Sequence, residues 1–168
     1  MTPFPLQNKQ AAALVNGKHT EVLVTAFSDK ILILVSQYGK VGSLLHTTVD
    51  NPQEMQRPQT TYSPYDPAYS EERDGSNLRL ATTNTTFLLG AGSATSKKAQ
   101  LYQVYTSHVA QMIVHQNPQE TRSIVFSLAL DVPEPVDTQD AGAYEAQRQK
   151  DKTLFEEVVR LVNQCRVW

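Results

Sequence analysis

Short runs rich in apolar residues fill the first quarter of the chain. Residues 11–15 and 20–27 form two such runs, with Asn16-Gly17 close to their junction. Because Asn-Gly tolerates positive φ angles at both central turn positions, this segment predicts a two-residue β-hairpin. In the second run the valines share one side with Ala26, so we expect one strongly buried face and one mixed face.

The next run, residues 31–35, is apolar at every position. It is too short to indicate a helix, and it predicts a strand that is buried on both faces. Gly39 and Gly42 then permit a tight reversal, after which residues 43–49 can return as a further strand. We therefore expect four consecutive strands joined by short turns, an antiparallel meander.

Two later segments show the spacing of helices. The first begins near Ser96 and ends at Asn117-Pro118, because proline cannot continue the hydrogen-bond ladder. The second covers residues 143–164. The buried stripe expected for the first helix is Leu101, Val104, Tyr105, His108, Val109, Met112 and Ile113. The stripe expected for the second is Leu154, Val158, Leu161, Val162 and Cys165, with Phe155 beside it.

Strands are also expected at residues 85–89 and 123–130, and the second is apolar on both sides, which favours a central place in a sheet. The pattern predicts an α+β fold, a mostly antiparallel sheet of about six strands with two main helices packed on it. The length of 168 residues fits a single domain over residues 1–168.

Residues 50–83 differ from the rest in composition, with four prolines among mainly polar residues. Such a stretch buries too little apolar surface to offset its ordering entropy, so we expect a long mobile loop inserted in the domain. Its Tyr62, Tyr65 and Tyr69 are candidates for contact with a partner. A second polar connection is expected from Pro133 to Gly142.

Charge and cysteine content narrow the classes of function. Fifteen basic and seventeen acidic residues give a net charge of -2 without any block of like charge, which argues against nucleic acid or a membrane surface as partner. The amino terminus lacks the apolar run of a signal peptide, and Cys165 is the only cysteine. We expect the cytoplasm as the location, with the nucleus as a second compartment.

Few residues suggest chemistry. Residues 90–98 form a glycine-containing turn before a helix, which could cradle a phosphate or be a capped structural turn, but the spacing of known nucleotide motifs is missing. His108 and His115 could share one helix face, although a third metal ligand is not evident. Cys165 lies on a helix stripe and is interpreted as a core residue. We expect no enzyme activity, no cofactor and no metal.

Three sequence segments resemble the proteasome assembly chaperone 3 family. Residues 20–44 resemble the amino-terminal half of the family through Thr-Ala-Phe-Ser at the turn, the apolar strand, and Gln-Tyr-Gly-Lys-Val-Gly at 37–42. Residues 85–90, Thr-Thr-Phe-Leu-Leu-Gly, and the ending Cys-Arg-Val-Trp at 165–168 resemble two further family motifs. The resemblance covers most of residues 11–49 and 84–168.

This resemblance implies a non-catalytic chaperone that acts as a dimer with the related assembly chaperone 4, or as a homodimer without it. It further implies binding to α-type subunits of the proteasome core particle during α-ring formation, without ATP or metal. The residues expected at partner contacts are Phe27, Gln37, Tyr38, Lys40, Tyr62, Tyr65 and Tyr69. The alternatives are a generic protein-interaction or scaffold module of the same fold, or a nucleotide-binding enzyme that uses residues 90–98.

Overall fold

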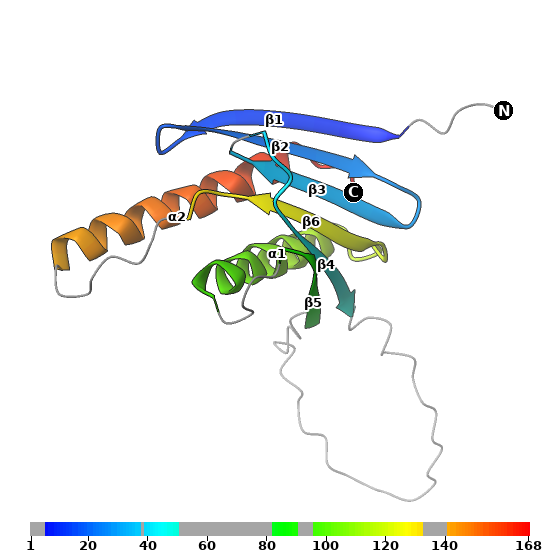
Figure 1. Cartoon of the computed structure of the whole chain (residues 1–168). Coiled ribbons are helices and arrows are strands. Elements are labelled where there is room, and N and C mark those ends of the chain that lie inside the picture. Colours follow the sequence, from blue (N-terminus) through cyan, green and yellow to red (C-terminus); the bar gives the residue numbers. More distant parts are fainter. Residues whose placement is uncertain (1–5, 38, 51–81, 91–95, 133–140) are drawn as a thin grey trace, which may run out of the picture.

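A computed structural model describes residues 6–37, 39–50, 82–90, 96–132 and 141–168. These form one six-stranded sheet and two helices (Figure 1). The strands are β1 (Gln7–Val15), β2 (Lys18–Ala26), β3 (Lys30–Ser36), β4 (Ser43–Asp50), β5 (Thr82–Leu89) and β6 (Ser123–Ala129), and the helices are α1 (Lys97–Gln116) and α2 (Ala141–Gln164). Four of the five strand pairings are antiparallel, which confirms the α+β fold class expected from the sequence.

The first hairpin has the predicted two-residue turn. Val15 pairs with Lys18, and the intervening Asn16 and Gly17 have φ angles of 49° and 78°. This is the left-handed conformation that Asn and Gly adopt with little strain. The local sequence is therefore sufficient to fix both the turn and the register of β1 against β2.

The expected four-strand meander is wrong at its last step. The strand order is β1-β2-β3-β6-β4-β5, so β6 lies between β3 and β4 and runs parallel to β3. The chain after β3 does not make a hairpin but crosses the end of β6 to reach β4. Gly42 permits this crossing, because a Cβ atom on it would lie 1.9 Å from the carbonyl oxygen of Leu128 in β6. Glycine is needed here for close backbone approach rather than for a tight turn.

The strands β5 and β6 both run antiparallel to β4, which separates them, so they are parallel to each other. With α1 as their connection they form a split βαβ unit. Of that turn, residues 91–95 lie outside the described residues. The inserted loop expected at 50–83 likewise falls mostly at 51–81, outside them, and β5 begins at Thr82 rather than at residue 85.

Helix α1 starts and ends where the sequence predicts. The Ser96 side chain caps it by accepting a hydrogen bond from the backbone N–H of Ala99 at 3.1 Å, and Asn117 is the C-terminal cap. Its buried face, however, is turned from the expected stripe, since Val104 and His108 are exposed. The buried residues of α1 are Ala99, Tyr102, Tyr105, Thr106, Val109, Ala110 and Ile113.

Two hydroxyl groups explain this different burial. Thr106 donates to the backbone oxygen of Tyr102 at 2.7 Å, one turn earlier in the helix. The Tyr102 hydroxyl accepts from the backbone N–H of Leu130 at 3.1 Å and lies 3.3 Å from the carbonyl oxygen of the same residue. Satisfied hydroxyl groups can be buried at small cost, so residues that a count of apolar positions leaves out are part of the core.

Helix α2 buries the predicted stripe, including Leu154 and Val158, and Cys165 is buried directly after the helix ends. Its first half is mostly exposed and extends beyond the sheet (orange in Figure 1). After the helix, Trp168 packs against the core and its indole N–H donates to Gln116 at 3.0 Å. No helix among the residues with described structure is long and apolar enough to cross a membrane.

The helices cover one face of the sheet. Helix α2 packs on β1 and β2, and α1 packs on β4, β5 and β6. On β3 the side chains of Ile31, Ile33 and Val35 are buried beneath them, whereas Leu32 and Leu34 point to the other face and are only partly buried. The expectation that β3 is buried on both faces is therefore wrong for the chain alone, because both helices pack on the same side.

Candidate protein-binding face

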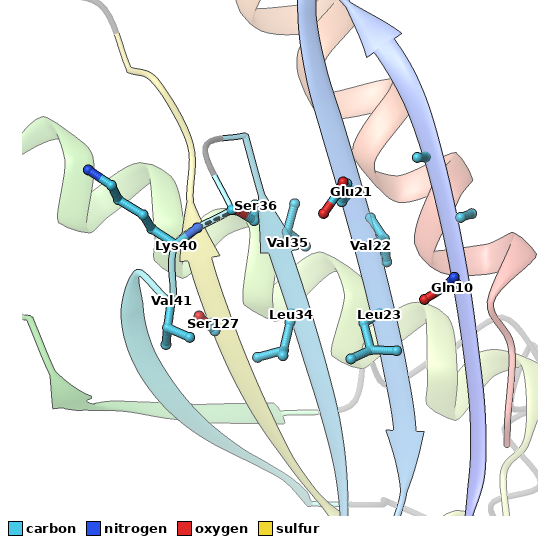
Figure 2. A pocket seen from close by; sticks show the side chains of 13 residues that line it. Gln10, Glu21, Val22, Leu23, Leu34, Val35, Ser36, Lys40, Val41 and Ser127 are labelled. Carbon is cyan, nitrogen blue, oxygen red and sulfur yellow. Dashed lines mark hydrogen bonds between the residues drawn. The ribbon is translucent and has the colours of Figure 1, made fainter.

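The sheet face opposite the helices carries an apolar centre. We define the leucine patch as Leu23, Leu32, Leu34, Leu44 and Val125. Strand register places Leu23 beside Leu34, and Ser127 lies between Leu34 and Leu44 in the same row. In the next row Leu32 lies beside Val125. Five large apolar side chains from four strands therefore share one face that no described helix covers. Figure 2 shows two of them, Leu23 and Leu34, on neighbouring strands.

Polar side chains surround the leucine patch. Asn8 and Gln10 on β1 and Glu21 on β2 are exposed on the same face, and His46 on β4 lies beside Val125. Exposed apolar residues add to the edges, with Val41 exposed to 68%. An apolar centre with a polar rim is the usual anatomy of a protein–protein interface, and contiguous exposed apolar patches commonly mark such surfaces. The chemistry of this face is suited to binding another protein.

A groove of about 460 Å³ lies beside the leucine patch. Its lining includes Gln10 and Ala12 from β1, Leu23 and Leu34 from the patch, and Lys40 and Val41 from the crossing after β3 (Figure 2). The register aligns Ala12 with Glu21 and Glu21 with Ser36, so two of the three side chains across this row are short. The short side chains leave a depression that an apolar side chain of a partner can fill.

The crossover segment, residues 39–42, forms one wall of the groove. The backbone N–H of Gly42 donates to Ser127 Oγ at 3.1 Å, which holds the segment against β6. The backbone N–H of Lys40 donates to Ser36 Oγ at 3.0 Å. Gly39 has a φ of 63°. These contacts leave the Lys40 and Val41 side chains exposed beside the groove.

The three predicted partner-binding residues that the structure describes do not form one surface. Lys40 is exposed at the groove, as a contact residue should be. Gln37 is only 8% exposed, and its side chain is bonded inside the protein. Phe27 follows β2 at the other end of β3 and is partly buried. The remaining predicted contacts lie outside the described residues, namely Tyr38, Tyr62, Tyr65 and Tyr69.

The turn that holds Phe27 is fixed by an ion pair. Arg122 binds both carboxylate oxygens of Glu120, at 2.8 and 2.7 Å, and also donates to the carbonyl oxygen of Phe27 at 3.1 Å. The Glu120 side chain is 7% exposed, and the hydrogen bonds from Arg122 hold the pKa of its carboxyl below the usual value. This arrangement joins the β2–β3 turn to the start of β6, so the backbone of Phe27 is held in place by contacts within the fold.

The residues considered for catalysis or metal binding lie where they contribute to packing. His108 packs edge-on against the ring of Phe155, with ring centres 5.0 Å apart. Cys165 is buried, and burial raises the pKa of its thiol, the opposite of what a reactive thiolate requires. Among the described residues no group of three or more His, Cys, Asp or Glu side chains could hold a metal ion.

Sequence reasoning missed the leucine patch as a site. The signal was present, because residues 31–35 are apolar at every position and the other run, 20–27, has a mixed second face. The first feature was interpreted as burial within the chain, and the mixed face was not interpreted as a site. The strand order was needed to show that the second face has no cover from the described helices.

Residues 33–165 match the model of the family proteasome assembly chaperone 3. This range includes most of the sheet, both helices, and three members of the leucine patch, Leu34, Leu44 and Val125. The chain belongs to the proteasome assembly chaperone 3 family. This match confirms the resemblance found in the sequence. It also confirms that the family is one of chaperones for proteasome assembly.

Individual members of the family match a shorter segment. Proteasome assembly chaperone 3 of Nematostella vectensis is 48% identical over 44 residues, which are 26% of this chain and 33% of that protein. The human protein is 46% identical over 44 residues, 26% of this chain and 35% of that protein. The aligned segment thus spans about a third of the length of these curated relatives.

A solved structure shares the fold over almost the whole chain. It belongs to a crystal structure described as a novel chaperone complex for yeast 20S proteasome assembly. The match covers 94% of this chain and 96% of that chain, with a TM-score of 0.55 and 14% sequence identity. At this identity the likeness establishes the fold of the assembly chaperone and not the residues of a binding site.

Proposed function

We propose that this protein is a non-catalytic chaperone that promotes assembly of the proteasome core particle by binding α-type subunits during α-ring formation. It acts as a dimer with the related assembly chaperone 4, or as a homodimer when that partner is absent. It needs no ATP and no metal. It works in the cytoplasm, with the nucleus as a second compartment, and residues 1–168 act as a single domain in which residues 50–83 are an inserted loop.

The observation that carries this proposal is the leucine patch on the open face of the sheet. A β-sheet that packs helices on one side normally exposes polar side chains on the other, and here the centre of that side is apolar. We assign the patch to the partner chaperone, whose own sheet would cover it. Family membership supports this occupant, as does the similar fold of a protein that is described as part of a chaperone complex.

The mechanism is differential binding. A chaperone that binds the α-ring intermediate and the finished core particle equally well can shift neither population. The protein must therefore bind free or partly assembled α-type subunits more tightly than the mature particle, and it leaves as β-type subunits are added. The energy for ordering the subunits comes from these contacts and from the addition of the next subunits.

Affinity purification of the tagged protein followed by mass spectrometry tests the proposal. We expect assembly chaperone 4 and α-type subunits to co-purify, with little mature core particle. Depletion of the protein should slow α-ring formation and accumulate misassembled intermediates. Normal proteasome assembly in depleted cells that lack a redundant chaperone would overturn the proposal.

Variants separate the binding face from the rest of the molecule. Leu34→Asp should lose assembly chaperone 4, because it places a charge in the apolar patch. Val104→Asp is the matched control, since Val104 is 56% exposed on α1, away from the open face. The conservative variants His108→Gln and Cys165→Ser should keep full activity when folded. Loss of activity in either one would mean that the protein performs chemistry that the proposal leaves out.

A further inference from the structure

Gln37 connects three parts of the fold through its side-chain amide. Its Nε2 donates to Thr20 Oγ1 on β2 at 3.0 Å, and its Oε1 accepts from the backbone N–H of Asp131 after β6 at 2.8 Å. Its own backbone N–H donates to the carbonyl oxygen of Ala129 at 3.0 Å. The residue is 8% exposed, so the amide is bonded in the interior rather than offered to solvent. A buried amide with both ends bonded has little freedom to take a second conformation.

The hydrogen bonds of Gln37 also affect the groove, because Gln37 lies directly before the chain that forms its wall. Gln37 follows β3 and precedes the crossover segment, which forms one wall of the groove with Lys40 and Val41. At the far end of the segment Gly42 is held by Ser127. The segment is thus fixed by Gln37 before it begins and by β6 where it ends.

We propose that Gln37 is a positioning residue for partner binding, which fixes the path of the crossover segment and so the wall of the groove. The proposal rests on the proposed function, in which the open face binds assembly chaperone 4. It replaces the expectation that Gln37 contacts the partner itself, because the amide would have to break its bonds to Thr20 and Asp131 to do so. Fixing the wall before binding lowers the entropy lost when the partner docks.

The first test measures the crossover segment without any partner. Gln37→Leu has a similar size and removes both amide bonds. The Asp131 N–H then loses its acceptor, and the Thr20 hydroxyl keeps only its 3.3 Å bond to the carbonyl oxygen of Lys18. Hydrogen exchange at the amides of Lys40 and Gly42 should become faster by about tenfold or more. Loss of two buried hydrogen bonds should raise the equilibrium constant for local opening of the segment by about that factor.

A control separates this local effect from general loss of stability. Val158→Ala truncates a fully buried side chain on α2, far from the segment in sequence, and lowers stability through the core. Exchange at Lys40 and Gly42 in Gln37→Leu should exceed that in Val158→Ala when both are compared at equal global stability. Unchanged exchange at both amides in Gln37→Leu would overturn the proposal.

A second pair of variants keeps the test decisive if Gln37→Leu fails to fold. Thr20→Val has a similar shape and removes the acceptor for Gln37 Nε2, whereas Thr20→Ser keeps a hydroxyl there. We expect faster exchange at Lys40 and Gly42 in the valine variant and near-normal exchange in the serine variant. Equal behaviour of the two would mean that the amide bond does not hold the segment, and would overturn the proposal.

The last test measures binding of purified assembly chaperone 4 from the same organism. Gln37→Leu should weaken its affinity by about tenfold relative to Val158→Ala. Faster exchange with unchanged affinity would overturn the positioning role. Failure of the proposed function has a different signature, namely that the unchanged protein does not bind assembly chaperone 4, and the exchange experiments do not depend on that result.

Discussion

Ile33 and Leu34 are neighbours on β3 and point to opposite faces of the sheet. Ile33 is fully buried beneath the helices, whereas Leu34 is partly buried in the leucine patch. The same substitution by aspartate therefore places a carboxylate in two different environments. We expect Ile33→Asp to unfold the protein and Leu34→Asp to leave it folded but unable to bind its partner.

The cost of Ile33→Asp can be estimated from its burial. Truncation of a buried isoleucine to alanine costs about 2 to 5 kcal/mol. Keeping a buried carboxyl protonated at pH 7, about three pH units above its ordinary pKa, costs about 4 kcal/mol more. The sum of about 6 to 9 kcal/mol is comparable with the whole stability of a typical domain, about 5 to 15 kcal/mol. A folded Ile33→Asp protein is therefore not expected at neutral pH.

The carboxylate of Leu34→Asp stays in contact with water in the isolated chain. The expected loss of unfolding free energy is about 1 to 2 kcal/mol, from lost partial burial and from the low strand propensity of aspartate. In the complex the same carboxylate would be buried at the centre of the interface. Substitution at such a position costs about 2 kcal/mol or more, a loss of affinity of about thirtyfold or greater.

Urea unfolding and calorimetric titration with assembly chaperone 4 measure the two effects separately. Val104→Asp on the outside of α1 should change neither quantity by much, because the new charge is exposed. Loss of cooperative folding in Leu34→Asp would show that the open face is covered by the chain itself. Full affinity in a folded Leu34→Asp protein would show that the partner binds elsewhere.

Three further changes test the fold. Trp168→Ala should lower the unfolding free energy by about 1.5 to 3 kcal/mol, because the indole is partly buried and hydrogen-bonded, and a urea midpoint shift worth less than about 0.5 kcal/mol would place it in solvent. Gly42→Ala should abolish folding, since its Cβ would overlap the backbone of β6. Its control, Gly17→Ala, has open space around the new Cβ and a φ of 78°, so it should cost only about 1 to 2 kcal/mol of strain, and equal melting temperatures of the two variants would refute the close approach at Gly42. The folded-state pKa of Glu120 is below its unfolded value, so its contribution to the unfolding free energy is complete above about pH 4.3 and is lost as the pH falls through the folded-state pKa. In a series of unfolding free energies measured against pH, Glu120→Gln should lack this loss of stability in acid.

Elements determined by neighbouring residues could be predicted from the sequence. Asn16-Gly17 fixes its hairpin, Ser96 caps α1, and Pro118 follows the end of that helix, each through contacts within a few residues. The strand order could not be predicted in this way. Insertion of β6 between β3 and β4 depends on pairing over many residues, and Gly42 is compatible with either a hairpin or a close crossing.

The candidate site was predicted less well than the fold because a binding face and a core have the same composition. The apolar side chains of Leu32 and Leu34 indicate that their side of β3 is removed from water, but they do not identify the group that covers them. Gln37 shows the opposite problem. Its sequence motif suggested a contact residue, and only the three-dimensional structure shows the amide bonded to Thr20 and Asp131.

The all-apolar sequence of β3 and the single-sided cover of the sheet have one common explanation in the proposed dimer. A strand whose residues are apolar on both faces lowers the free energy most when both faces are removed from water. The helices α1 and α2 provide this for Ile31, Ile33 and Val35. A partner sheet on the open face would provide it for Leu32 and Leu34, so the strand would be central in the dimer as well as in the chain. The original inference of a doubly covered strand then applies to the complex, and Leu34→Asp tests it there.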